Sequence, residues 1–197
     1  MKQAVSFTHV LAFFLSMLAV LVAPVQAQDG DLSPKDRADL VKNAFIDCDS
    51  TGEKCTAGDV ATGDFYNVTI YGDCFTNAYY GRIANKTVGV RETVSTTGSH
   101  TNILAHLPPN QLVCILATAS TGPGTGDVEQ YVLALPWDYK MKCREGQVCR
   151  LPLPKPTPKV MLKCKADHEA ERYVDCPTGW VFAREMEAYS MGLPGLE

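Results

Sequence analysis

Short runs of alternating apolar and polar residues fill the middle of the chain, and they predict a mainly β protein. Val88 and Val90 stand two positions apart, as do Leu112, Cys114 and Leu116, and this is the spacing of inward side chains in half-buried strands. Aromatic and branched residues are concentrated in three further runs, residues 65–71, 79–84 and 131–135. Pro108 and Pro109 lack the backbone donor that a central ladder needs, and Asn110 tolerates a left-handed backbone. The pattern therefore predicts short strands of a small barrel, with a tight turn at these prolines.

One segment near the N-terminus has a helical period instead. Its apolar residues are Ala38, Leu40, Val41, Ala44 and Phe45. Ser33 is a good N-cap, Pro34 fits the first helical position, and Asp36 follows the cap by three residues. We expect an amphipathic helix from residue 34 to about 46, with its apolar stripe packed into the core.

Residues 47–63 are rich in Asp, Ser, Thr and Gly, which predicts a loop. Asp47, Asp49, Thr51 and Glu53 alternate like calcium ligands, but the distal glutamate of an EF-hand is missing. We expect a disulfide-closed polar turn here.

The first 27 residues have the pattern of a secretory signal. Lys2 precedes an apolar run at residues 10–23, and Val25-Gln26-Ala27 is a small-x-small ending. No second run of this kind follows. We expect a periplasmic or secreted protein that meets the membrane only through its cleaved signal peptide.

All eight cysteines follow that signal, and this favours disulfide bonds in an oxidising compartment. Eight cysteines can pair in many ways, and the sequence does not choose among them. Local geometry favours Cys143 with Cys149 across a hairpin, and Cys48 with Cys55 around a short loop. The remaining pairs are then Cys74 with Cys114 and Cys164 with Cys176.

A zinc site is the alternative use of these cysteines. Cys143, Cys149, Cys164 and His168 supply a possible ligand set, but the close C-x2-C spacing of a zinc knuckle is absent. We expect neither a metal nor another cofactor.

Several short motifs in this chain resemble the bacterial SH3 (SH3b) domain family. The family pattern has a strand ending in Val-Arg, a Ser/Gly-rich loop, an apolar strand, a turn and a Val-x-Val-Leu strand. The corresponding segments here are residues 88–91, 96–99, 103–107, 108–110 and 112–116. The family often closes with Gly-Trp-Val, which this chain has at residues 179–181.

The resemblance implies a small SH3-like barrel, stabilised by disulfides, over residues 64–192. A long insertion at about 120–170 separates the matching pieces and contains a predicted β-hairpin. Residues 28–63 precede this domain as an N-terminal helix and a disulfide-closed loop. The resemblance further implies a protein that attaches to the cell wall, recognises a peptide or docks another protein.

Charge is unevenly distributed along the chain, whose net charge is -4. Residues 29–73 hold ten acidic and four basic residues, whereas residues 140–165 hold eight basic residues and one acidic residue. The second segment predicts a basic arm that binds an anionic surface, or else a solvated hairpin face. Nucleic acid is not expected as a partner of an exported acidic protein.

We expect no enzymatic activity from this sequence. It has no G-x-S-x-G motif, and every cysteine has a plausible disulfide partner. Glu129, Asp138, Glu169 and Asp175 are possible acid–base pairs for glycoside hydrolysis, but sequence spacing does not test the distance this chemistry requires.

The candidate binding residues fall into three groups, because ligands of small barrels lie against loops and exposed aromatics. They are the polar turn Thr96, Thr97, Ser99 and His100, the aromatic residues Tyr79, Tyr80 and Trp180, and the basic residues Lys140, Lys142, Arg144 and Lys163. Trp180 is equally compatible with a place in the core. The expected partner is a cell-wall peptide or a protein. The alternative is a periplasmic inhibitor or immunity protein that blocks an enzyme with a loop or the basic arm.

Overall fold

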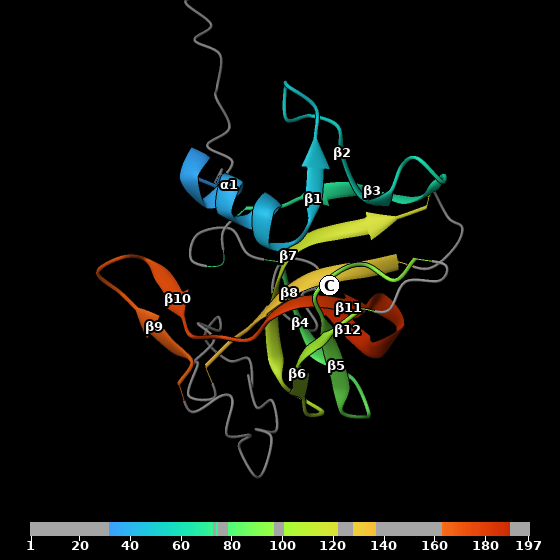
Figure 1. Cartoon of the computed structure of the whole chain (residues 1–197). Coiled ribbons are helices and arrows are strands. Elements are labelled where there is room, and N and C mark those ends of the chain that lie inside the picture. The colour runs from blue at the N-terminus through green and yellow to red at the C-terminus, as the bar shows by residue number, and fades with distance from the viewer. Residues whose placement is uncertain are drawn as a thin grey trace, which may run out of the picture.

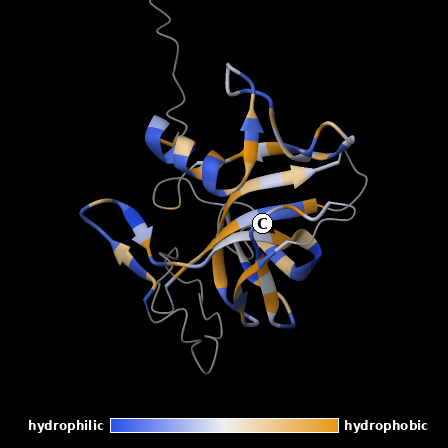
Figure 2. Ribbon diagram, in the orientation of Figure 1, coloured by the Kyte–Doolittle hydropathy of each residue, from blue (hydrophilic) through white to orange (hydrophobic). Residues whose placement is uncertain are grey.

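The computed structural model describes residues 32–72, 74, 79–96, 101–121, 128–136 and 163–189. In this part of the chain one α-helix, a ten-stranded antiparallel sheet and a separate two-stranded hairpin make up the fold (Figure 1). The prediction of a mainly β protein with an N-terminal helix is confirmed. Hydrophobic residues recur along the central strands, while α1 and the hairpin β9–β10 carry long hydrophilic stretches (Figure 2).

The elements have the following bounds: α1 Pro34–Asn43, β1 Ile46–Cys48, β2 Cys55–Asp59, β3 Asp64–Ile70, β4 Tyr79–Ile83, β5 Val88–Arg91, β6 Ile103–Leu107, β7 Leu112–Ser120, β8 Val128–Ala134, β9 Lys165–Asp167, β10 Arg172–Val174, β11 Thr178–Phe182, the 3-10 helix η2 Ala183–Glu185, and β12 Met186–Tyr189.

In the described part of the chain, the sheet branches at its longest strand and is not closed into a barrel. Its main path is β1-β2-β3-β7-β8-β11-β5-β6, and β4 pairs with both β7 and β12. β7 has β8 on one side, while β3 and β4 share its other side, β3 opposite residues 117–120 and β4 opposite residues 112–115. The expectation of a closed barrel is therefore corrected, because the path ends at β1 and β6 without returning on itself.

Helix α1 begins as predicted and ends earlier than predicted. The Ser33 hydroxyl accepts a hydrogen bond from the Asp36 backbone N–H at 3.1 Å, with Pro34 in the first turn. Phe45, which the apolar stripe assigned to the core, is 57% exposed and has a φ of 52°. Its neighbour Ala44 is fully buried, with its carbonyl oxygen bound by Trp180 Nε1 at 3.0 Å. The chain therefore turns outward at Phe45 between the helix and β1.

Two strands, β1 and β2, occupy part of the segment that was predicted to be a loop. The paired residues Cys48 and Cys55 face each other across this hairpin and form a disulfide. Within the connection, Asp49 Oδ1 accepts hydrogen bonds from the backbone N–H groups of Thr51 and Glu53. The polar composition therefore predicted the turn between the strands correctly but not the strands themselves. The Cys48–Cys55 disulfide links β1 to β2 on either side of this turn.

Strand β8 lies within residues 120–170, the segment taken as an insertion, yet it is a central strand. It pairs with β7 over residues 128–134 and with β11 over residues 129–133. Tyr131 and Val132 are both buried. The segment therefore contributes to the middle of the sheet as well as to its periphery.

Trp180 on β11 is fully buried and packs against Tyr131, with ring centroids 5.2 Å apart. The preceding residue, Gly179, allows β11 to approach β5 closely: a Cβ there would lie 2.5 Å from the Arg91 carbonyl oxygen, and its φ is 156°. Trp180 thus connects the C-cap of α1, through the Ala44 carbonyl, to the centre of the sheet.

Three of the four expected disulfides lie in the described residues, and all three are confirmed: Cys48–Cys55, Cys74–Cys114 and Cys164–Cys176. Cys143, Cys149 and the basic hairpin around them lie outside the described residues. The disulfides indicate an oxidising, extracytoplasmic environment. In the described ranges, no helix combines the length and hydropathy needed to span a membrane.

Candidate functional site

The β5–β6 loop, residues 92–102, carries the polar turn that the sequence proposed for binding. Its two ends are joined by the Glu92 N–H, which donates to the Asn102 carbonyl at 3.0 Å. The Asn102 side-chain amide also donates to the Glu92 carboxylate at 2.8 Å. One residue further into the loop on each side, the Thr101 hydroxyl accepts from the Thr93 N–H at 3.2 Å and donates to the Thr93 carbonyl at 3.3 Å. Hydrogen bonds between its two ends therefore hold the loop together where it leaves the sheet.

The first half of this loop is fixed to the hydrophobic core cluster to which α1 and β1–β3 contribute. Val94 is buried in the same core cluster as Leu40 and Trp180. The Ser95 N–H donates to Glu129 Oε1 at 2.9 Å, and the Tyr66 hydroxyl donates to the Ser95 carbonyl at 2.8 Å. Both backbone groups of Ser95 are thus held by side chains from distant strands.

A buried ion pair lies beneath this anchor. Arg91, the last residue of β5, donates to Glu129 Oε2 from Nη2 at 2.7 Å, and Glu129 has no exposed surface. The Arg91 guanidinium also lies 3.7 Å from the centre of the Phe182 ring, a cation–π arrangement. Burial of both charges carries a desolvation cost that only good mutual geometry offsets. Glu129 satisfies both the cation and the loop backbone.

Thr96 is half-buried and packs close to β2. A Cβ on Gly58 would lie 3.0 Å from Thr96 Cγ2 and 2.7 Å from the Asp64 carbonyl oxygen, so only glycine leaves room for this contact. The φ of Gly58 is 105°, which also favours glycine. The other residues of the predicted turn, Thr97, Ser99 and His100, lie outside the described residues.

The predicted aromatic residues do not form one surface. Tyr79 is 48% exposed, and its ring lies 4.5 Å from that of Tyr71. Tyr80 is half-buried, and its hydroxyl donates to the Cys74 carbonyl at 3.3 Å. Trp180 has no exposed surface, and strands β7 and β8 separate its strand from β4. Tyr79 is therefore the predicted aromatic residue with the most surface available to a ligand.

Of the predicted basic residues, Lys163 lies in the described part of the chain and is exposed. Lys140, Lys142 and Arg144 lie outside it. The basic arm thus stays a prediction from charge.

The sequence analysis missed Glu129 and Tyr66 as residues that hold the loop. A glutamate at an inward position of an alternating strand, Val128–Ala134, was a usable signal, because an acid there needs a buried partner. Its partner Arg91 closes the Val-Gly-Val-Arg motif, but nothing in the sequence relates positions that are 38 residues apart. Glu129, one of the acid–base candidates of the sequence, is fully buried and paired with Arg91.

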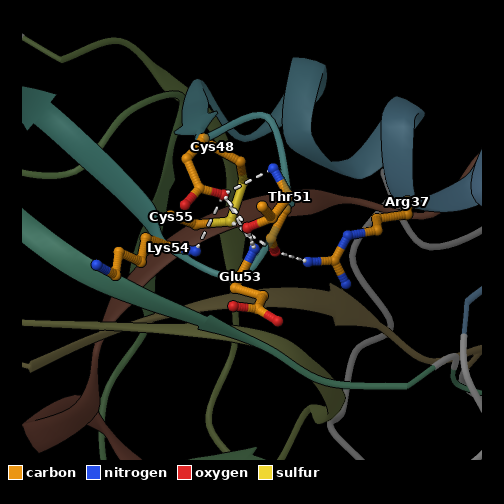
Figure 3. Close-up of a disulfide and its surroundings, with 8 residues drawn as sticks. Arg37, Cys48, Thr51, Glu53, Lys54 and Cys55 are labelled. Carbon is orange, nitrogen blue, oxygen red and sulfur yellow. Dashed lines mark hydrogen bonds between the residues drawn. A yellow bond between two sulfur atoms is a disulfide. The ribbon is translucent and has the colours of Figure 1, made fainter.

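The polar turn between β1 and β2 is organised around its own backbone (Figure 3). Asp49 Oδ1 also accepts from the Thr51 hydroxyl at 2.8 Å, and Arg37 donates from Nη2 to the Gly52 carbonyl at 2.6 Å. The bond from the Thr51 side chain lowers the pKa of Asp49 below its ordinary value, and backbone N–H groups of the turn add to this effect. The Asp49 carboxylate therefore stabilises the turn by accepting these hydrogen bonds. In the described residues, no three His, Cys, Asp or Glu side chains are placed to hold a metal ion.

Tyr131, which packs against Trp180 in the core, is a second titratable residue with a shifted pKa. Burial raises the pKa of its hydroxyl to about 12, so this residue is neutral throughout the physiological range. Tyr131 therefore packs as an uncharged side chain against Trp180.

Searches with this chain against family models, curated proteins and solved structures found no match.

Proposed function

We propose that this protein is an exported, disulfide-stabilised binding protein of SH3b-like type, which recognises a cell-wall peptide or a protein partner without catalysis. The β5–β6 loop is its recognition element. Tyr79 and the basic arm are secondary candidates for the same partner.

The observation that carries this proposal is the anchor beneath the loop. The loop is attached through Ser95 and Val94 to a buried ion pair and to the core, while Thr96 leads into the polar turn. A loop whose base is already ordered loses less conformational entropy on binding than a free loop. The ordered base at Val94 and Ser95 therefore supports the proposal that residues 97–100 contact a partner.

The arrangement of the SH3b-like segments supports the family part of the proposal. The segments that carry the motif become β5, β6, β7 and β11, and β5 pairs with both β6 and β11. The 3-10 turn η2 follows the Gly-Trp-Val segment, and β12 then returns beside β4. The open sheet and the added strands β1–β3 are departures from a simple small barrel.

Co-sedimentation of the purified, oxidised protein with intact peptidoglycan tests this function. We expect saturable pelleting, and we expect the Ser99→Ala/His100→Ala variant to weaken it at least tenfold. Asn85→Ala/Thr87→Ala is the matched control, because it removes two polar side chains from the exposed β4–β5 connection. Pelleting that is absent, or unchanged in the loop variant, would remove the wall-binding form of the proposal.

A protein partner is the other form, and it includes the inhibitor or immunity function. Crosslinked capture from the exported fraction then identifies whether the loop contacts an enzyme. Inhibition of that enzyme by the wild-type protein, and its loss in the loop variant, would establish the inhibitor function.

A further inference from the structure

Strand β6 is an edge strand with an apolar surface. In the part of the chain that the structure describes, it has one neighbouring strand, β5, and the path of the sheet ends there. Figure 1 shows the β5–β6 hairpin at the end of the sheet opposite the β1–β2 hairpin. Ile103 and Leu104 are 49% and 54% exposed, and His106 is also exposed. An edge strand carries backbone donors and acceptors that a further strand can use.

This edge lacks the charges that commonly keep exposed strands from pairing. No Lys, Arg, Asp or Glu occurs between residues 101 and 112, a stretch that covers all of β6 and its flanks. Lysine on an edge strand opposes pairing because its charge would have to be desolvated by the incoming strand. An incoming strand with few charges meets no such barrier at β6.

Ile103 is an apolar side chain at this edge that packs against β5 and is also half exposed. The register between β5 and β6 shifts after Val90, where Arg91 pairs with Ile103. Ile103 covers Gly89: a Cβ at Gly89 would lie 2.9 Å from Ile103 Cδ1. Because the glycine leaves that space free, the isoleucine lies directly on the backbone of β5 while half of its surface faces solvent.

The register shift also favours a flexible occupant over a second copy of this protein. A β-bulge bends the strand that carries it and interrupts regular pairing with a rigid, straight partner. Two β6 strands of five residues, each with this irregular register, would match over few positions. An extended peptide can follow the bend.

We infer that β6 binds an extended, apolar, weakly charged peptide segment by β-strand addition, with Ile103 and Leu104 packing against its side chains. Main-chain hydrogen bonds supply affinity in this mode, and alternate side chains supply specificity. The inference deepens the proposed function, on which it rests, because it names the chemistry of the peptide and places it beside the recognition loop.

Selection from a random heptapeptide library displayed on phage, against the immobilised, oxidised protein, supplies the probe. Each enriched peptide is then synthesised with a fluorescent label, and its affinity is measured by anisotropy. We expect the enriched peptides to be apolar and low in charge. Leu104→Lys should weaken binding at least tenfold. The matched control Val60→Lys alters a side chain of similar exposure, 56%, in the β2–β3 turn and should leave affinity unchanged.

N-methylation of the peptide gives a second measurement on the wild-type protein. Every second N–H group of an added strand donates to its neighbour, so methylation of two adjacent residues, one at a time, should weaken binding at one position and spare the other. This readout does not depend on the folding of any variant.

Absence of enriched peptides, equal affinity for Leu104→Lys, or equal effects of the two N-methyl isomers would overturn the inference. A wild-type dimer in sedimentation velocity that Leu104→Lys dissociates would also overturn it, since the edge would then bind a second copy. Failure to pellet with peptidoglycan, together with strand-like peptide binding, would refute wall binding alone. Pelleting without such peptides would refute strand addition alone.

Discussion

Two connections in this sheet are held in place by opposite means. The turn between β1 and β2 is closed by the Cys48–Cys55 disulfide, seven residues apart in sequence, and by Asp49, which binds N–H groups two and four residues ahead. The loop between β5 and β6 is fixed through Ser95 to Glu129 and Tyr66, which are 34 and 29 residues away. Contacts within seven residues, together with Arg37 of α1, hold the first connection, whereas the second depends on strands from distant parts of the assembled sheet.

The difference has a consequence for binding. Local contacts form early and survive small changes elsewhere, while contacts between distant strands require the whole sheet to be in place. We therefore expect the β5–β6 loop to lose its order whenever β8 or β11 is disturbed, and the β1–β2 turn to keep its order. The variants below separate the two connections.

Glu129→Gln should have the largest effect, because it leaves the buried Arg91 cation without a counter-charge. Removal of one partner of a buried ion pair costs about 3–5 kcal/mol of unfolding free energy. Urea unfolding measures this loss, and faster amide hydrogen exchange at Ser95 should accompany it. The double variant Arg91→Met/Glu129→Gln should be more stable than Glu129→Gln alone. A single variant within 1 kcal/mol of wild type would show that the pair does not hold the loop.

Opening the β1–β2 turn should have a smaller, local effect. Cys48→Ala/Cys55→Ala removes a bridge with a sequence separation of 7, worth roughly 2–3 kcal/mol from the entropy of loop closure. Amide exchange should quicken at Thr51 and Glu53 and stay slow at Ser95. Cys164→Ala/Cys176→Ala, which opens the base of the β9–β10 hairpin, is the control that should leave the Asp49 turn protected. Loss of protection at Ser95 in the first variant would mean that the two connections are coupled.

The smallest effect concerns the charge of Asp49. Its pKa is lowered from 3.8 in the folded protein, so the carboxylate stabilises the fold at higher pH, and this contribution is lost as the pH falls through the lowered pKa. We expect wild type to melt at a slightly higher temperature than Asp49→Asn at neutral pH, and the difference to vanish in acid below the lowered pKa of Asp49. Asp47→Asn, at an exposed carboxylate two residues away, is the control. A melting difference that persists in acid would assign the effect to side-chain shape rather than charge.

Much of the local structure was predictable because its signals are close together in sequence. The Ser33 cap, the left-handed Asn110 with a φ of 64°, and the strands at residues 79–84 and 131–135 follow from neighbouring residues. The disulfide Cys48–Cys55 follows from a short spacing. In each case the forces act within a few residues, so the sequence pattern is sufficient.

The exposure of Phe45 and the burial of Trp180 were not predictable in this way. A helical period places Phe45 on the apolar stripe, yet the bond from Trp180 to the Ala44 carbonyl fixes the end of the helix and turns Phe45 outward. An aromatic residue at a motif is as compatible with a core as with a binding surface until its neighbours are known.

Composition, charge and periodicity determined that this protein is mainly β, with a capped helix at residue 34 and disulfide cross-links. The tertiary structure alone decided that β3 and β4 share one side of β7, that the path of the sheet ends at β1 and β6, and that Glu129 lies beneath the loop. It also decided that β6 is one of the edge strands in the described part of the sheet. These properties depend on which distant strands become neighbours, and hydrogen bonding between strands leaves no periodic trace of the partner in either sequence.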